Sequence, residues 1–354
     1  MKLKLKNTPE QVELIKAMGS RDTTVAREAS EAFAAFIGPV VSKVLMEAGT
    51  SSAVYSDLSF DEDDNPSIPL DLWSQETEGY TTVWSQNVAG GLPSSVVEGF
   101  NEMKVSTYRL DSAVSLLKRY ARRARLDVVS KAVERMANEV LVKQERNAWA
   151  VVLKALATAS TNNQNHIVTA ANQTLVLKDL SDLLTKVKRI NTSYAKGSTT
   201  SSYGVTDLCL SPEVVGHIRE FAYNQVGNNK TDLPAGVREE IYRGAGAQEI
   251  FGISLHELVE LGVNGKYNVL FDSFYGANPT EFDPGTDEVL IGLDLTKDAF
   301  VRPVARNSET GGTFTAQPDD QFVSRSEKIG FYGSLEEGRV CLDGRAVAGI
   351  VIKA

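Results

Sequence analysis

The stretch DSAVSLLKRYARRARLDVVSKAVERMANEVLVKQERNAWAVVLKALA, residues Asp111 to Ala157, contains neither glycine nor proline. Most of its residues favour or tolerate a helix. Its apolar residues recur in steps of three and four, which predicts a long helix with one core-facing stripe. Asp127 can cap a second helix, so we expect a bend near residues 125–127. Two packed core helices and a single spine across an elongated subunit both fit this pattern. The stripe comprises Ala113, Leu117, Ala121, Ala124, Val128, Ala132, Met136 and Val140, widened by Val129, Val133, Ala137 and Leu141.

The composition is that of an ordinary globular protein, with 42% hydrophobic and 23% charged residues in 354. This length favours about two domains. The net charge of −9 argues against a dedicated nucleic-acid binder, which would usually be basic. Cys209 and Cys341 are too few for a disulfide framework, and we expect both to be buried. The sequence shows no signal peptide and no membrane-spanning run.

The N-terminal residues predict a helical arm. Thr8 suits the N-cap of a helix that Pro9 begins and Gly19 ends. Residues 20–48 carry a second helical pattern, which Gly38-Pro39 is expected to interrupt. The arm could pack on its own subunit or reach a neighbour.

Residues 61–109 predict a long hairpin-like excursion, with strands at 81–84 and 96–105. An isolated hairpin is only marginally stable in water. The aromatic side chains of Trp73, Trp84 and Phe100 are therefore expected to dock, on their own subunit or on the next one.

The remaining chain reads as an α/β segment followed by returning strands. Residues 196–202 have the composition of a flexible linker and predict a domain boundary. Ser211 and Pro212 suit the start of a helix, and Asp343-Gly344 suits a hairpin turn. The other expected elements are a helix at 180–190 and strands at 166–169, 174–177, 205–210, 250–255, 267–271, 289–295, 300–304, 328–335, 339–342 and 346–352.

No enzymatic motif is complete, so the sequence predicts no catalytic residue, no metal site and no cofactor. The run from His256 and Glu257 to Glu260 resembles a zinc-protease helix, but Glu260 stands where the second histidine ligand is needed. A nucleophile elbow, a P-loop and a dinucleotide fingerprint are also absent. An alternative from a different class is a cytosolic α/β hydrolase that uses His256 with Glu257 or Glu260.

A cluster of basic residues stands out in this acidic chain, at the start of the expected long helix. It is either a solvated face or a surface that pairs with acidic residues of a neighbouring subunit, for which Asp61 to Asp64 are one candidate. The cluster comprises Lys118, Arg119, Arg122, Arg123 and Arg125.

The order of these parts resembles the major capsid proteins of tailed bacteriophages, which have the Hong Kong 97-type fold. The resemblance is carried by residues 100–113 running into the long helix, by Ser211-Pro212-Glu213, by Phe251-Gly252-Ile253 and by the closing strands from Arg325 to Ile352. It implies an α+β fold with five segments. These are an N-terminal arm (1–60), an extended loop (61–109), a peripheral domain with the spine helix (110–202), an axial domain (203–298) and returning peripheral strands (299–354).

The resemblance also implies a non-enzymatic structural function. Copies of the chain would form hexamers and pentamers of an icosahedral shell around a viral DNA genome, assembled in the host cytoplasm and found in the virion. Scaffold, portal or cement proteins are expected partners, packaged DNA would be held without sequence specificity, and no membrane is involved. The expected contacts between subunits are Trp73, Trp84, Phe100 and the five basic residues. Residues 67–101 contain no lysine, so the cross-linking that some relatives perform is not expected. An encapsulin-like cargo compartment is the alternative within the same fold.

Overall fold

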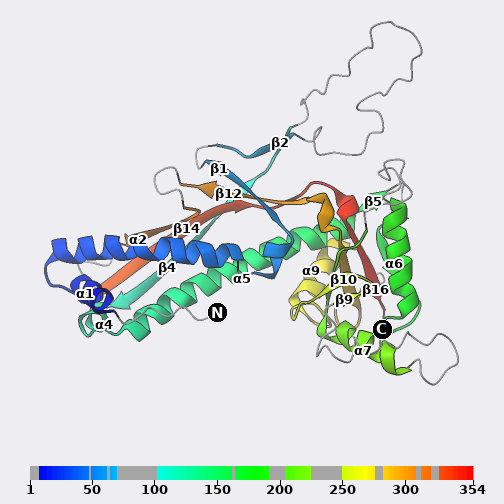
Figure 1. The fold of residues 1–354 in the computed structure, drawn as a ribbon, viewed down its shortest axis with the longest axis horizontal. Coiled ribbons are helices and arrows are strands. Elements are labelled where there is room, and N and C mark those ends of the chain that lie inside the picture. Colours follow the sequence, from blue (N-terminus) through cyan, green and yellow to red (C-terminus); the bar gives the residue numbers. More distant parts are fainter. Residues whose placement is uncertain are drawn as a thin grey trace, which may run out of the picture. The chain divides into compact units, whose positions relative to one another are not determined.

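The computed structural model describes residues 8–47, 49–61, 64–69, 102–161, 164–190, 204–224, 249–275, 282–307, 312–319 and 327–353 (Figure 1). The chain forms two compact units. Unit 1 comprises Met1–Ile68, Lys104–Ala148 and Val301–Val340, and unit 2 comprises Pro69–Met103, Trp149–Phe300 and Cys341–Ala354.

A single helix, α5 (Leu126–Thr158), contributes residues to both units, up to Ala148 in unit 1 and from Trp149 in unit 2. The predicted bend before it is confirmed. The short helix α4 (Lys118–Arg122) ends in a turn in which Ala124 has a left-handed backbone (φ 50°) and the Arg125 amide donates to the Tyr120 carbonyl.

The prediction of helix was wrong for residues 111–117, which belong to the strand β4 (Thr107–Leu117). This strand pairs along its whole length with β14 (Lys328–Gly338). The sequence here has apolar residues at both helical and alternating spacing. The alternating set decides the structure, because it places Leu110, Val114 and Leu116 against the core of unit 1.

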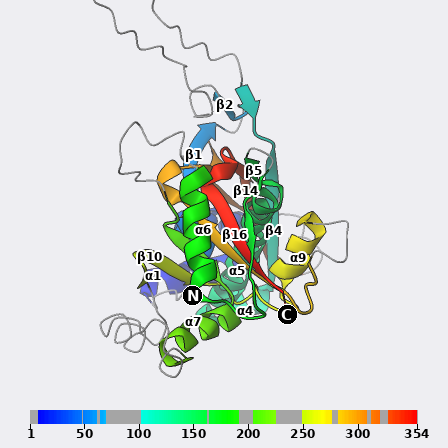
Figure 2. The same ribbon diagram turned by 90° about the vertical axis from the view of Figure 1, so that its right-hand side faces the viewer.

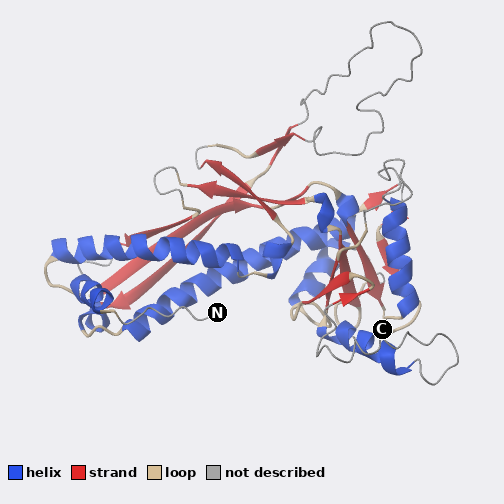
Figure 3. Ribbon diagram, viewed as in Figure 1, coloured by secondary structure: helices blue, strands red, loops and turns tan. Residues whose placement is uncertain are grey.

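The main sheet of unit 1 has the order β1-β12-β14-β13, with β15 paired to β12 and β4 paired to β14. The strands shown in red in Figure 3 include β1 (Ser56–Asp61), β12 (Phe300–Arg306), β13 (Phe314–Asp319) and β15 (Val340–Cys341). Two further short strands, β2 (Ser67–Pro69) and β3 (Glu102–Lys104), pair with each other. The core of unit 1 lies between this sheet and helices α1 (Pro9–Met18), α2 (Thr23–Glu47) and α5.

The predicted N-terminal helices are confirmed, but Pro39 lies inside α2 instead of interrupting it. A proline within a helix costs about 3 kcal/mol or more. Packing explains why α2 continues. Phe33 and Ile37 before the proline, and Val41 and Leu45 after it, belong to the same buried cluster, so breaking the helix would expose half of this face.

A buried carboxylate connects three elements of unit 1. Glu337 on β14 is 0% exposed and accepts hydrogen bonds from Tyr108 Oη on β4 (2.7 Å) and Gln144 Nε2 on α5 (2.9 Å). The Arg339 guanidinium lies 3.3 Å from the same carboxylate and stacks 4.6 Å from the ring centroid of Tyr55. On α5, Glu145 accepts from Thr50 and Ser51 at the start of the short helix η1 (Thr50–Ala53).

Unit 2 is built on a sheet of order β7-β16-β11-β8-β10-β9. Every residue of β11 (Glu288–Leu293) and β16 (Val347–Ile352) is buried, as expected for two neighbouring interior strands of a covered sheet. In Figure 2, helix α6 (Leu177–Ile190) lies in front of β16, which it contacts. The remaining strands are β7 (Ile167–Thr169), β8 (Asp207–Leu210), β9 (Glu249–Ile250) and β10 (Ile253–Glu257), and the remaining helices include α7 (Pro212–Asn224) and α9 (Lys266–Tyr275).

Three expectations for unit 2 were wrong. Residues 267–271 lie in α9, where Tyr267, Asn268 and Phe271 are buried at helical spacing. Residues 174–176 are not strand, and Leu177 begins α6. Asp343-Gly344 is no hairpin, because the strands on either side pair with different partners, β15 with β12 and β16 with β11 and β7. Between them the Asp343 carboxylate accepts from the Arg345 amide and begins the short helix η5 (Gly344–Ala346).

The predicted start of α7 is confirmed, with Ser211 Oγ accepting from the Val214 amide at 3.1 Å. The predicted linker at 196–202 and most of the excursion at 61–109 lie outside the described residues. The two units also cut across the expected segments. Residues 110–202 and 299–354 are each divided between the units, because α5 and the closing strands take part in both. Within the described parts of the chain, no helix is long and apolar enough to span a membrane.

Two glycines of unit 2 provide a matched test of this packing. A Cβ on Gly349 of β16 would lie 2.7 Å from the Leu290 carbonyl oxygen and 2.9 Å from Leu156, whereas a Cβ on Gly216 of α7 would meet nothing within 4 Å. We expect Gly349→Ala to lower the free energy of unfolding by about 1–3 kcal/mol. Gly216→Ala should raise it by about 0.5–1 kcal/mol, because alanine favours a helix. Urea denaturation measures both; a neutral Gly349→Ala would contradict the tight β11–β16 packing.

Candidate functional site

The five basic residues lie together at one end of unit 1, on α4 and in the turn after it. Lys118, Arg119 and Arg122 are in α4, Arg123 is its C-cap, and Arg125 precedes α5. They were expected on the long helix itself. The structure places them before it, because residues 111–117 form β4 and the helix begins only at Leu126.

Three of the five side chains are engaged within the subunit. Arg122 Nε donates to the Gly19 carbonyl at 2.8 Å, which ties α4 to the end of α1. The Arg119 guanidinium stacks 5.0 Å from the ring centroid of Tyr120, and Arg125 lies 3.9 Å from the Asp127 carboxylate. Each of these contacts partly compensates the positive charge of its arginine. The hydrogen bond of Arg122 also links two helices of the subunit.

Arg123 and Lys118 differ from these three. The side chain of Arg123 is exposed and that of Lys118 half-buried, and neither forms a hydrogen bond or ion pair with another described side chain. Asp61 and Asp64 are exposed as well, and no ion pair joins them to the basic cluster among the residues described. Trp73, Trp84 and Phe100 lie outside the described residues. Of the predicted contact residues, only the five basic ones are described, and these lie close together.

The residues of the hydrolase alternative do not converge. His256 Nε2 lies 2.7 Å from Asp207 Oδ1 on the neighbouring strand. Glu257 follows His256 directly on β10, so the two side chains leave opposite faces of the sheet. Glu260 lies beyond the strand, with Oε1 3.7 Å from Lys266 Nζ. The described residues contain no group of three or more histidine, cysteine or acidic side chains that would hold a metal ion.

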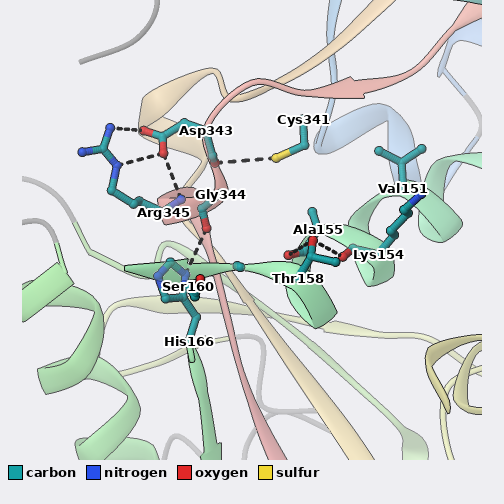
Figure 4. A pocket seen from close by; sticks show the side chains of 11 residues that line it. Val151, Lys154, Ala155, Thr158, Ser160, His166, Cys341, Asp343, Gly344 and Arg345 are labelled. Carbon is teal, nitrogen blue, oxygen red and sulfur yellow. Dashed lines mark hydrogen bonds and ion pairs between the residues drawn. The ribbon is translucent and has the colours of Figure 1, made fainter. Parts of the chain in front are cut away.

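A pocket of about 440 Å³ in unit 2 was not foreseen from the sequence (Figure 4). It lies among the end of α5, the start of β5 (Ser160–Thr161) and η5. In Figure 4 His166 points toward η5, and its Nδ1 lies 3.1 Å from the carbonyl oxygens of both Gly344 and Val347. Since both partners only accept, Nδ1 carries the hydrogen.

The charged groups beside this pocket neutralise one another. Arg345 donates twice to the Asp343 carboxylate, at 2.9 and 3.0 Å, and Lys297 Nζ lies 3.6 Å from it. Burial would raise the pKa of Asp343, but the hydrogen bond from Arg345 and the charge of Lys297 outweigh it and hold that pKa below its usual value. Burial raises the pKa of the Cys341 thiol to about 12 and lowers the pKa of His166. Cys341 is therefore a protonated thiol and not an activated nucleophile at neutral pH.

Only a weak signal in the sequence indicated this arrangement around Asp343. An Asp-Gly-Arg run fits a hairpin turn as well as a capped helical turn. Only the pairing of the flanking strands with different partners distinguishes the two.

Comparison with solved structures finds proteins of similar fold. A chain described as "Capsid of empty GTA particle computed with C5 symmetry" matches with a TM-score of 0.52 and 12% identity, over 87% of this chain and 91% of that one. The mature capsid of bacteriophage PhiM1 matches with a TM-score of 0.50 and 9% identity, over 85% and 86%. The holo-SrpI encapsulin complex from Synechococcus elongatus reaches only 0.43, with 12% identity over 71% and 75%, which is too low to carry an argument. At these identities the likeness concerns the fold alone, and it confirms the α+β fold expected from the sequence.

No protein-family model matches the sequence, and a search of curated proteins finds no significant relative.

The buried His166 predicts a pH dependence of stability. Its folded pKa is lowered, so below its unfolded value of about 6.5 the unfolded chain binds more protons than the folded chain. We expect the free energy of unfolding to fall as the pH drops below about 6.5. His166→Asn keeps a donor near Nδ1 without a titrating group and should flatten this dependence. Urea denaturation at pH 7.5 and 5.5 measures the free energy of unfolding of both proteins. If it falls equally for the wild type and His166→Asn between these two pH values, His166 is not a buried neutral imidazole.

Proposed function

Because the chain has the Hong Kong 97-type fold of these capsid proteins, we propose that it is a major capsid protein, a non-enzymatic structural protein. Copies would form the hexamers and pentamers of an icosahedral shell that encloses a viral DNA genome. One observation carries the proposal. The fold agrees with a capsid chain over 87% of this protein and 91% of the other, so the likeness extends across both units.

The chemistry of the surface supports this proposal. A shell subunit needs exposed groups that its own fold leaves unanswered, since these can pair with neighbours. The exposed side chains of Arg123, at one end of unit 1, and of Asp61, elsewhere in it, are groups of this kind among the described residues. A closed symmetric shell repeats each such contact many times, so individually weak contacts suffice.

The assignment of segments follows from the proposed function. Residues 1–60 would be the N-terminal arm and 61–109 the extended loop that reaches a neighbour. The sheet of unit 1 would belong to the peripheral domain, with α5 as the spine, and the sheet of unit 2 to the axial domain around residues 203–298.

The partners follow in the same way. The first partner is the chain itself, and scaffold, portal or cement proteins would complete the particle. The net charge of −9 suits a shell that confines DNA without binding it tightly or by sequence. The protein would be found in the virion after assembly in the host cytoplasm, with no role for a membrane.

We expect the purified protein to sediment as particles of megadalton mass or as the capsomers that precede them. Analytical ultracentrifugation at micromolar concentration, with negative-stain microscopy of the fractions, measures this. Nuclease-resistant DNA inside particles from producing cells would mark a viral shell, whereas protein cargo would mark the encapsulin-like alternative. A monomer at every salt concentration and pH would contradict the proposed function.

Charge reversal at Arg123 separates assembly from folding. This exposed side chain has no described partner, so Arg123→Glu should change the free energy of unfolding by less than about 0.5 kcal/mol. If the residue faces an acidic neighbour, the reversal places like charges together and can cost several kcal/mol at each contact. We expect a folded subunit that forms few particles.

Lys131→Glu, an exposed reversal on α5, is the matched control and should assemble normally. Arg122 is a poor choice for this test, since its reversal also removes the hydrogen bond to Gly19. Normal assembly of Arg123→Glu would show that Arg123 belongs to a solvated face.

A further inference from the structure

Helix α2, the long blue helix of Figure 1, has a second apolar face that stays exposed among the described residues. Phe36 and Val40 are 46% and 41% exposed, and Ala32, Ala35 and Pro39 are exposed beside them. The spacing of 32, 35, 36, 39 and 40 is that of one helical stripe. We call these five residues the outer stripe.

The outer stripe lies opposite the core-facing side of the helix. The buried side chains of Phe33, Ile37 and Val41 fall on the other face, where Phe33 packs 5.2 Å from the ring of Phe331 on β14. A surface helix normally has one apolar stripe and one polar face. Because Ala32 to Val40 replaces the polar face over more than two turns, α2 carries a contiguous exposed apolar patch of the kind that marks an interaction site.

A negatively charged residue lies at one end of the outer stripe and a positively charged residue at the other. Glu28 lies four residues before Ala32, and Lys43 lies three residues after Val40, so both share its face. Both are exposed, and neither forms an ion pair or side-chain hydrogen bond with another described residue. Phe36 lies close to the midpoint between them.

This pattern is complementary to itself. When two copies of α2 cross antiparallel at Phe36, Glu28 of each helix lies beside Lys43 of the other, and the two outer stripes meet between these pairs. A parallel arrangement would instead bring like charges together at both ends. A contact that uses the same patch on both subunits is what a two-fold axis requires, and closed shells contain such axes.

We propose that the outer stripe of α2 binds the outer stripe of a second copy of this chain, antiparallel about a two-fold axis near Phe36. The inference deepens the proposed function and rests on it for its place in a shell. The contact itself depends only on the residues of α2.

A matched pair of variants tests the apolar part. Val40→Ser removes an apolar side chain from the outer stripe. Val142→Ser makes the same change at an equally exposed valine of α5, 43% exposed, outside the stripe. Both should fold with wild-type circular dichroism. We expect Val40→Ser to weaken self-association roughly tenfold in sedimentation velocity and Val142→Ser to leave it unchanged.

Charge exchange tests the antiparallel geometry. Glu28→Lys and Lys43→Glu each place like charges at both ends of the contact and should weaken self-association roughly tenfold. The double variant Glu28→Lys with Lys43→Glu restores opposite charges across the axis and should recover it. A purely structural role for either residue would not produce this recovery.

The outcomes separate the inference from the proposed function. If the wild type forms particles and every variant does too, the antiparallel contact is wrong and the shell function stands. If the chain forms only a dimer that shows the charge rescue, the contact stands and the shell function is wrong. A wild-type monomer, a double variant as weak as the single ones, or equal effects of Val40→Ser and Val142→Ser would each overturn the contact.

Discussion

A carboxylate without exposed surface, that of Glu337, sets the arrangement of unit 1. Burying a charged group is costly unless it is paired and hydrogen-bonded, so the groups around it must be in place when the unit folds. Tyr108 from β4 and Gln144 from α5 both donate to it, and Arg339 supplies the opposite charge. Burial and the nearby carboxylate raise the pKa of Tyr108, which keeps its hydroxyl a donor. These contacts fix the start of β4 and the middle of α5 against β14.

The same constraint accounts for the position of the basic cluster. β4 runs along β14 for eleven residues and ends at Leu117, which leaves only a short turn of helix before α5 begins. Five basic residues fall in this turn. Arg122 and Arg125 have partners in the subunit, whereas the exposed Arg123 has no side-chain partner among the described residues. A position set by the buried core thus determines which of these charges stay exposed.

The histidines show why residue type alone did not indicate chemistry. His166 is 1% exposed and donates to backbone carbonyls, and His256 pairs with Asp207 on the next strand. Cys341 lines the pocket between α5 and η5, but burial raises its pKa. His166, His256 and Cys341 each contact a carbonyl or carboxylate oxygen within unit 2.

Local sequence determined the elements whose signals are chemical and short in range. The start of α1 at Pro9, the cap that Ser211 gives α7, and the amphipathic helices α6 and α5 were all present in the sequence. So was the order of helices and strands that resembles a capsid protein. Tertiary structure decided the conformation of the segments whose local sequence fits two secondary structures about equally well. Residues 111–117 became strand because β14 offers eleven paired positions, and α2 continues through Pro39 because both of its halves share one core. Asp343-Gly344 became a helical turn because its flanking strands pair with different partners, and the exposure of Phe36 and Val40 depends on which face of α2 the sheet covers. Long-range strand pairing and burial contribute more free energy than local propensity. Which strands pair and which helix face is buried cannot be predicted from local sequence patterns alone.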